Sequence, residues 1–141
     1  IRNVHKALDN ERIKIREALG YTKPHFPLDD HYNLEGEEWM YGNGAHEKLV
    51  DGEDWFEPLE LKTHRYMRED VACGLAFLVS VGEWLNVPVP TAKGLLAIAS
   101  AVVGEDLRVT GRTMENLQLA TKTKAELKEI LEKGLLQYEI S

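Results

Sequence analysis

The chain has 141 residues and a mass of 16.0 kDa, long enough for one compact domain that hides roughly two-thirds of its unfolded surface. Its hydrophobic content of 43% and charged content of 29% are ordinary for a globular protein, and its longest apolar run, residues 71–81, is too short to span a bilayer. The net charge of −7 argues against a nucleic-acid-binding face, because neutralising phosphates requires clustered lysine and arginine.

The first predicted element is an amphipathic helix over residues 2–19, which Gly20 closes. Its apolar stripe consists of Val4, Leu8, Ile15 and Leu19. Its charged side chains lie largely opposite that stripe: Asp9, Glu11, Lys14 and Glu17. The stripe predicts that this helix packs against the rest of the molecule.

Residues 22–60 are predicted to form an acidic, loop-rich excursion with one or two short helices, because prolines and glycines interrupt any longer element. Residues 29–60 hold eleven acidic side chains against the single Lys48, and we expect this part to be mobile over a pocket. His25, His31 and His46 lie among these acids. A solvated acidic surface explains them better than a metal site, because no pair of ligands has helical spacing.

Two apolar helices are predicted next, over Val71–Leu85 and from the N-cap Thr91 to Val103, where Gly104 stops the second. A turn with two prolines joins them, so they should form the core of an all-α helical bundle. Further on, Thr113 should cap a short helical turn. Thr123 and Glu126 should form a capping box for a last helix, ended by Gly134.

Ionisable residues crowd where the first apolar helix should begin: His64, Arg65, Arg68, Glu69 and Asp70. Charge placed against apolar packing is typical of a functional site. The acids could equally complement a helix dipole, and Arg65 could simply pair with Glu69 or Asp70. We expect Tyr66 and Met67 to belong to the core.

The sequence around this cluster resembles a known family. His64-Arg65-Tyr66, two further residues, Glu69-Asp70-Val71 and then Gly74-Leu75 are similar to the opening motif of the helical C-terminal domain of the opine dehydrogenases, such as octopine and nopaline dehydrogenase. Similar blocks follow in the family's order at residues 86–91 and 111–117, and residues 7–21 resemble its preceding helix. Ala72 and Gln118 depart from the pattern, standing where proline and glycine are common.

This resemblance implies an all-α fold like the C-terminal domain of 6-phosphogluconate dehydrogenase, with residues 1–141 forming a single substrate-binding domain. In the family, NADH or NADPH reduces the imine formed from an amino acid and an α-keto acid. A histidine paired with an aspartate serves as the acid. The aspartate's position falls on Asp70, which we therefore predict to be catalytic. His64, Arg65 and Glu69 are the candidates for substrate binding.

The remainder of such an enzyme is not recognisable in this chain. The histidine belongs to a His-Pro segment that should lie upstream, and Gly42-Asn43-Gly44 lacks the third glycine of a dinucleotide fingerprint. We therefore expect a piece of a larger enzyme, with the amino acid, the keto acid and an N-terminal Rossmann domain carrying NAD or NADP as partners, a possible homodimer, and no activity for the chain alone. No metal, membrane or nucleic-acid partner is expected.

Alternatives remain at this point. The chain could be a non-catalytic helical interaction or dimerisation module, or part of a different reductase of the same superfamily. Arg112 resembles a family-typical position, although Asp106 or Glu115 could serve as its structural partner. The lone Cys73 is predicted to be a small buried hydrophobe, and a single cysteine fits a reducing, cytoplasmic location.

Overall fold

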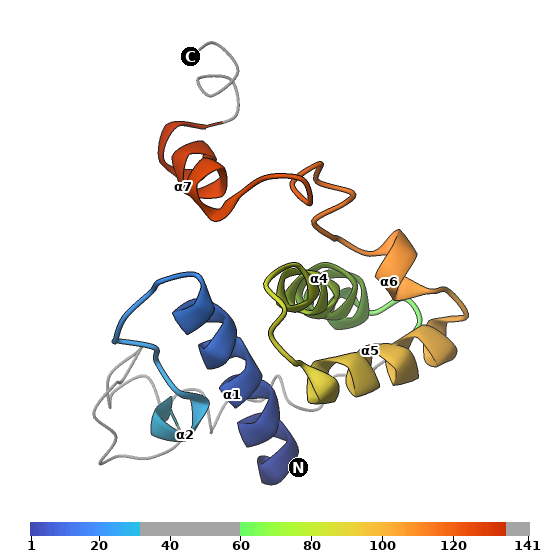
Figure 1. Ribbon diagram of the computed structural model, residues 1–141. Coiled ribbons are helices and arrows are strands. Elements are labelled where there is room, and N and C mark those ends of the chain that lie inside the picture. Colours follow the sequence, from blue (N-terminus) through green and yellow to red (C-terminus); the bar gives the residue numbers. More distant parts are fainter. Residues whose placement is uncertain (32–59, 135–141) are drawn as a thin grey trace.

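The computed structural model describes residues 1–31 and 60–134, and every regular element within these ranges is helical. In chain order the elements are α1 (Arg2–Ala18), α2 (Leu28–His31), η2 (Tyr66–Leu75), α4 (Ala76–Trp84), α5 (Pro90–Val103), α6 (Leu107–Thr110) and α7 (Lys124–Lys133) (Figure 1). The all-α prediction is therefore confirmed. Most of the predicted acidic excursion, with His46 and the sequence Gly42-Asn43-Gly44, lies outside the described residues.

Helix α1 matches the predicted amphipathic helix, and Gly20 follows its end with a left-handed φ of 92°. One part of the prediction was wrong. Glu11 does not lie on a solvated face but is only 5% exposed, because its carboxylate accepts hydrogen bonds from the backbone amides of Thr91 and Ala92, at 2.7 and 2.9 Å. The helix thus buries a charged side chain along with its apolar stripe.

The next predicted helix begins five residues earlier than expected. Its first part, η2, is a π-helix with i→i+5 hydrogen bonds, and it continues directly into α4. Arg68, Glu69 and Asp70 therefore lie inside the helix and not before it. The fully buried residues are confined to α4 and include Val79, Ser80 and Val81, whereas η2 has none.

Helix α5 confirms the second apolar helix and ends at Gly104, which has a φ of 77°. The predicted N-cap Thr91 was wrong. The cap residue is Val89, Pro90 occupies the first turn, and no side chain of the cap itself accepts a hydrogen bond. The backbone amides of Thr91 and Ala92, which have no carbonyl partner within the helix, donate instead to Glu11, from a distant part of the chain.

The C-terminal part follows the predicted caps closely. Thr113 Oγ1 accepts a hydrogen bond from the Asn116 amide at 3.0 Å, within a turn that does not extend into a helix. Thr123 and Glu126 form the expected capping box of α7, and Gly134 ends that helix. The short helix α6 was not predicted. Asp106 caps it, and Arg108 lowers the pKa of this carboxyl by donating hydrogen bonds to it.

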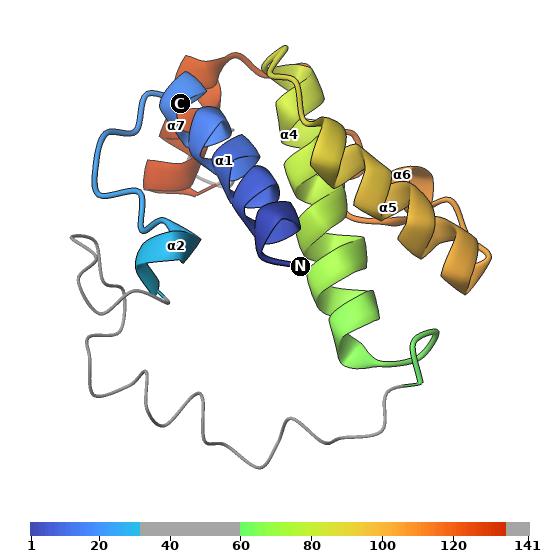
Figure 2. The same ribbon diagram turned by 90° about the horizontal axis from the view of Figure 1, so that it is seen from below.

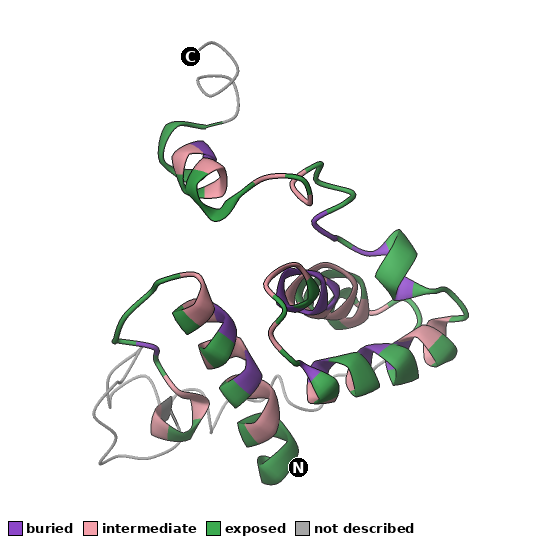
Figure 3. Ribbon diagram, viewed as in Figure 1, coloured by how far each residue is buried: buried purple, intermediate pink, exposed green. Residues whose placement is uncertain are grey.

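Helices α1, α4 and α5 enclose the core (Figures 1 and 2). In Figure 3 their buried positions turn toward the space between them. The least exposed large side chains are Leu96, Leu107, Met114 and Val89. Helix α7 lies at the end of α1, where Lys124 Nζ donates to the Ala18 carbonyl at 2.9 Å. No helix in the described ranges has both the length and the apolar character needed to cross a membrane.

Candidate functional site

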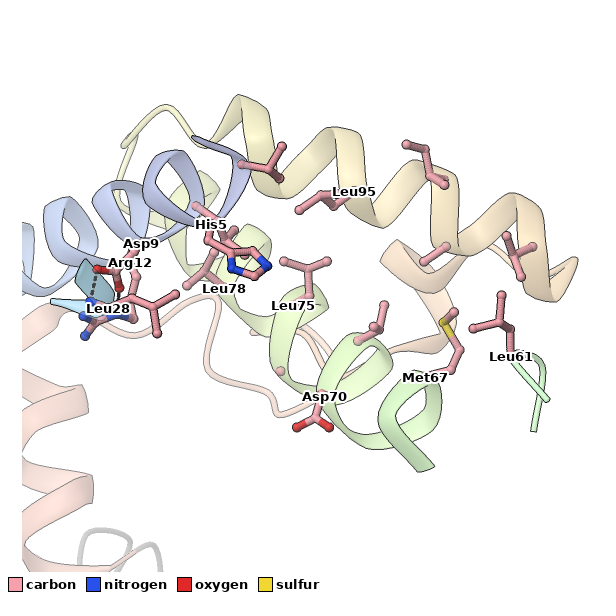
Figure 4. Close-up of a pocket in the computed structure, with 17 residues that line it drawn as sticks. His5, Asp9, Arg12, Leu28, Leu61, Met67, Asp70, Leu75, Leu78 and Leu95 are labelled. Atoms are coloured by element: carbon pink, nitrogen blue, oxygen red, sulfur yellow. Dashed lines mark hydrogen bonds and ion pairs between the residues drawn. The ribbon is translucent and has the colours of Figure 1, made fainter. Parts of the chain in front are cut away.

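An open pocket of about 710 Å³ lies between α1, the η2–α4 helix and α5 (Figure 4). Most of its lining is aliphatic. Leu8 comes from α1, Leu75 and Leu78 from the η2–α4 helix, and Leu95 and Ile98 from α5. Four lining residues are ionisable: His5, Asp9, Arg12 and Asp70. A largely apolar hollow with a few polar groups is the usual form of a small-molecule site.

Asp70 is the residue of the predicted cluster that lines this pocket. It lies in the second turn of η2 and is exposed. In Figure 4 its carboxylate points away from the apolar side chains of Leu75 and Leu95. The acid therefore sits where the apolar lining meets solvent, available to a group that approaches from outside.

The other predicted site residues lie nearby but are not part of the lining. His64 precedes η2, and its Nδ1 accepts the Tyr66 amide at 3.2 Å. The Arg65 guanidinium lies 4.9 Å from the centroid of the Tyr66 ring, and interaction with this side chain, followed by attraction to Glu69 and Asp70, raises the Arg65 pKa. Arg65 and Glu69 are both exposed.

Several secondary expectations for this region need correction. Tyr66 is not a core residue, since it is 49% exposed, whereas Met67 both packs against the core and lines the pocket. Cys73 is only partly buried. Arg68 tethers η2 to the end of α5 through an ion pair with Glu105, with 3.1 Å between Nη1 and Oε1.

Sequence reasoning missed the polar residues that α1 contributes to the pocket. Arg12 donates from Nε to Asp9 at 2.7 Å and from Nη2 to the carbonyls of His25 and Phe26, at 2.9 and 3.0 Å. Asp9 also accepts the Leu28 amide at 2.7 Å. The i,i+3 spacing of Asp9 and Arg12 on a predicted helix could have indicated this pair. Both side chains are occupied in fixing the segment before α2 onto α1.

The suggested partners of Arg112 were also wrong. Asp106 pairs with Arg108 at 2.8 Å, and Glu115 accepts a hydrogen bond from Ser80 Oγ at 3.2 Å. The Arg112 side chain is exposed, and it is its backbone amide that makes a long-range contact, to Ala72. Within the described residues, no three His, Cys, Asp or Glu side chains gather closely enough to hold a metal ion.

The comparison with known proteins decides the family. The model of the NAD/NADP octopine/nopaline dehydrogenase alpha-helical domain matches residues 1–103, which include the motif helix and the pocket-lining residues of α1 and α5. The chain belongs to the octopine/nopaline dehydrogenase family. The resemblance of residues 64–75 to the opine dehydrogenases is thus confirmed at the level of the family, and with it the identification of the chain as the helical domain.

Relatives with curated names agree with this assignment. The chain is 39% identical over 131 residues to the opine dehydrogenase of Arthrobacter sp. (strain 1C), covering 89% of the chain and 34% of the relative. It is 33% identical to the vitopine synthase of Allorhizobium ampelinum and 32% identical to the protein ocs of Agrobacterium vitis. These matches cover 79% and 80% of the chain. The chain spans about a third of the length of these relatives. No solved structure matches it.

Proposed function

We propose that this chain is the substrate-binding domain of an NAD(P)H-dependent opine dehydrogenase, which condenses an amino acid reductively with an α-keto acid. The observation that carries the proposal is that Asp70, a residue of the family-like motif, lies at the edge of an apolar pocket. The volume of this pocket, about 710 Å³, is in the usual range for a small-molecule site. The relatives' names and their threefold greater length support a parent oxidoreductase with a further domain.

The dinucleotide would be held by that further domain and not by this one. A pyrophosphate requires a strand, a glycine-rich turn and a helix N-terminus in succession, and the described ranges of this chain contain helices without strands. This chain's contribution is to bind and orient the substrate and to supply one of the two acid–base groups. The cytoplasmic location stays a prediction.

In this proposal Asp70 accepts a hydrogen bond from a histidine supplied upstream, in the His-Pro segment that the resemblance implies. A carboxylate in that role holds the imidazole in one orientation and stabilises it when it is protonated. The exposed carboxylate of Asp70 is accessible to such a partner. His64, Arg65 and Glu69 stay candidates for binding the substrate from the same end of the helix, with the Arg65 guanidinium suited to bidentate contact with a substrate carboxylate.

The pocket lining favours an amino acid with an apolar side chain. Its lining is mainly aliphatic, and its arginine, Arg12, already binds Asp9 and two backbone carbonyls. The aliphatic part of the lining offers a charged substrate side chain no partner, so placing such a side chain there costs its hydration. A comparison of kcat/KM for leucine, arginine and glutamate with one keto acid checks this preference, and equal values for all three would contradict it.

A non-catalytic dimerisation module is the competing proposal, and exposed apolar side chains favour it, including Ile98 at 65%. The deciding experiment is Asp70→Asn in the longer protein that carries this chain. We expect kcat to fall by about a hundredfold or more with little change in melting temperature, because the amide is nearly isosteric but cannot stabilise an imidazolium.

Glu69→Gln is the comparison for kcat, because Glu69 does not line the pocket and, as a candidate for substrate binding only, should act on KM. It should cost much less turnover than Asp70→Asn. A fully active Asp70→Asn enzyme would rule out the proposed role of Asp70. Lowered melting temperatures for both variants, with unchanged activity per folded molecule, would indicate a purely structural one.

A further inference from the structure

The helix that carries Asp70 changes its hydrogen-bond register just beyond that residue. In η2 the bonds run from i+5 to i, and the amide of Ala76 still donates to the carbonyl of Val71. Helix α4, which follows, has the ordinary i+4 to i pattern. Where the wider pattern gives way to the narrower one, a carbonyl is passed over and needs a partner outside the helix.

The Ala72 carbonyl has such a partner. It accepts a hydrogen bond of 2.8 Å from the backbone amide of Arg112, forty residues further along the chain. This bond is possible because the residue before Arg112 is glycine. A Cβ on Gly111 would lie 2.5 Å from the Ala72 carbonyl oxygen and 2.8 Å from the Ala76 Cβ, and it would also clash with the Leu107 carbonyl oxygen. Gly111 has a φ of −76°, so space and not backbone conformation requires glycine there.

Side chains of Asn116 and Ser80 hold the backbone around Gly111 and Arg112 in place. Asn116 Nδ2 donates to the carbonyls of Val109 and Gly111, at 3.0 and 2.8 Å. The buried Ser80 Oγ on α4 accepts the Met114 amide at 2.8 Å. These contacts fix the Arg112 amide at the Ala72 carbonyl, so the bond does not depend on a freely moving loop.

We propose that the backbone of Gly111 and Arg112 locks the π-helical register of η2 and thereby positions Asp70 at the pocket. A π-helix turns less per residue than an α-helix, so its register decides which way the residues before Ala72 face relative to α4. Without the bond from Arg112, the Ala72 carbonyl accepts a hydrogen bond from the Ala76 amide, and η2 changes from the i+5 to i pattern to the i+4 to i pattern of an α-helix. Asp70 then rotates away from the pocket edge. Gly111 is a positioning residue, and this inference rests on the proposed function of Asp70.

Gly111→Ala in the longer protein tests the proposal. We expect a crystal structure of the variant to show the Ala76 amide bonded to Ala72 in place of Val71, and the Arg112 amide to exchange with solvent faster. We expect kcat to fall about tenfold or more, with the KM of the nicotinamide cofactor unchanged. Gly94→Ala is the control, because a Cβ there meets nothing within 4 Å and Gly94 does not line the pocket. Gly94→Ala should leave the Ala76–Val71 bond, the exchange of the Arg112 amide and kcat unchanged.

Should Gly111→Ala fail to fold, Asn116→Ala weakens the same bond without adding bulk and should produce smaller changes in the same direction. Retention of the bond between Ala76 and Val71 in the folded variants would overturn the proposal. The proposal would also be overturned if the folded variants had a changed hydrogen-bond register in η2 but kept full turnover while Asp70→Asn was impaired. If Asp70→Asn is fully active as well, the role of Asp70 has failed, while a changed register still supports the lock itself.

Discussion

The buried carboxylate of Glu11 joins two helices that are distant in sequence. Its two hydrogen bonds go to the first amides of α5, where the helix dipole favours a negative charge. It therefore substitutes for the side-chain cap that Val89 cannot provide. Hydrogen bonds to charged groups are among the stronger ones in proteins, and the exclusion of water around Glu11 adds to the cost of losing them.

Glu11→Gln should therefore lower the free energy of unfolding by about 2 kcal/mol, because the amide keeps one acceptor but turns an N–H group toward an N–H group. Urea denaturation measures this loss. Lys14→Gln is the control on the same helix, since Lys14 is exposed and should change stability by no more than about 0.5 kcal/mol. Equal effects of the two substitutions would contradict the capping role.

At the same scale, Glu11 shows why sequence reasoning failed for some residues. Its position on α1, next to other charged residues, predicted a solvated side chain, because local periodicity reports only which face a residue lies on. The amides that it binds lie 80 and 81 residues away, and no local pattern indicates them. Asp70 was singled out by a motif and not by periodicity; it does line the pocket, and its catalytic role stays a prediction.

Among the elements, the helices with local signals were predicted well. Gly20, Gly104 and Gly134 each follow a predicted helix with a positive φ, and the capping box of α7 is present as predicted. The start of η2 was not predicted correctly, because its charged residues match a loop as well as a helix. Its π-helical register depends on the contact between Ala72 and Arg112, which are distant in sequence. Elements set by tertiary contacts leave no such local signal.

Helix α7 offers a test at this scale, because its start depends on one residue. Thr123→Ala removes the Thr123 Oγ1 that accepts the Glu126 amide, and should destabilise the helix by about 1 kcal/mol. Amide hydrogen exchange should quicken in α7 while α4 and α5 stay protected. Thr121→Ala, two residues earlier and outside the helix, is the control. Unchanged exchange in α7 would show that packing alone holds it.

At the scale of the whole molecule, the described residues form a helical core with a pocket, and they contain no strand that could frame a dinucleotide. The all-α class, the two apolar helices and the family were predictable from sequence, since they depend on long apolar runs and a dense motif. The pocket was not, because α1, η2 and α5 each contribute only part of its lining. Asp9 and Arg12 were overlooked for the same reason.

The 141-residue chain alone should therefore not bind NADH or NADPH at micromolar concentrations. Isothermal calorimetry, or quenching of its three tryptophans, measures this directly. The longer protein carrying both domains is the positive control and should bind. Micromolar binding by the chain alone would refute the assignment of the cofactor to another domain.

The bonds between Glu11 and the start of α5 also bear on how the family can diversify. They close a loop of about eighty residues, and residues 32–59 lie within that loop. The entropic cost of closing a flexible loop grows only with the logarithm of its length, about 0.6 kcal/mol for each doubling. A change in the number of residues between Glu11 and α5 therefore costs the Glu11 bonds little, so relatives whose chains differ in length there can keep the same contact, provided that pocket residues such as Leu61 are retained.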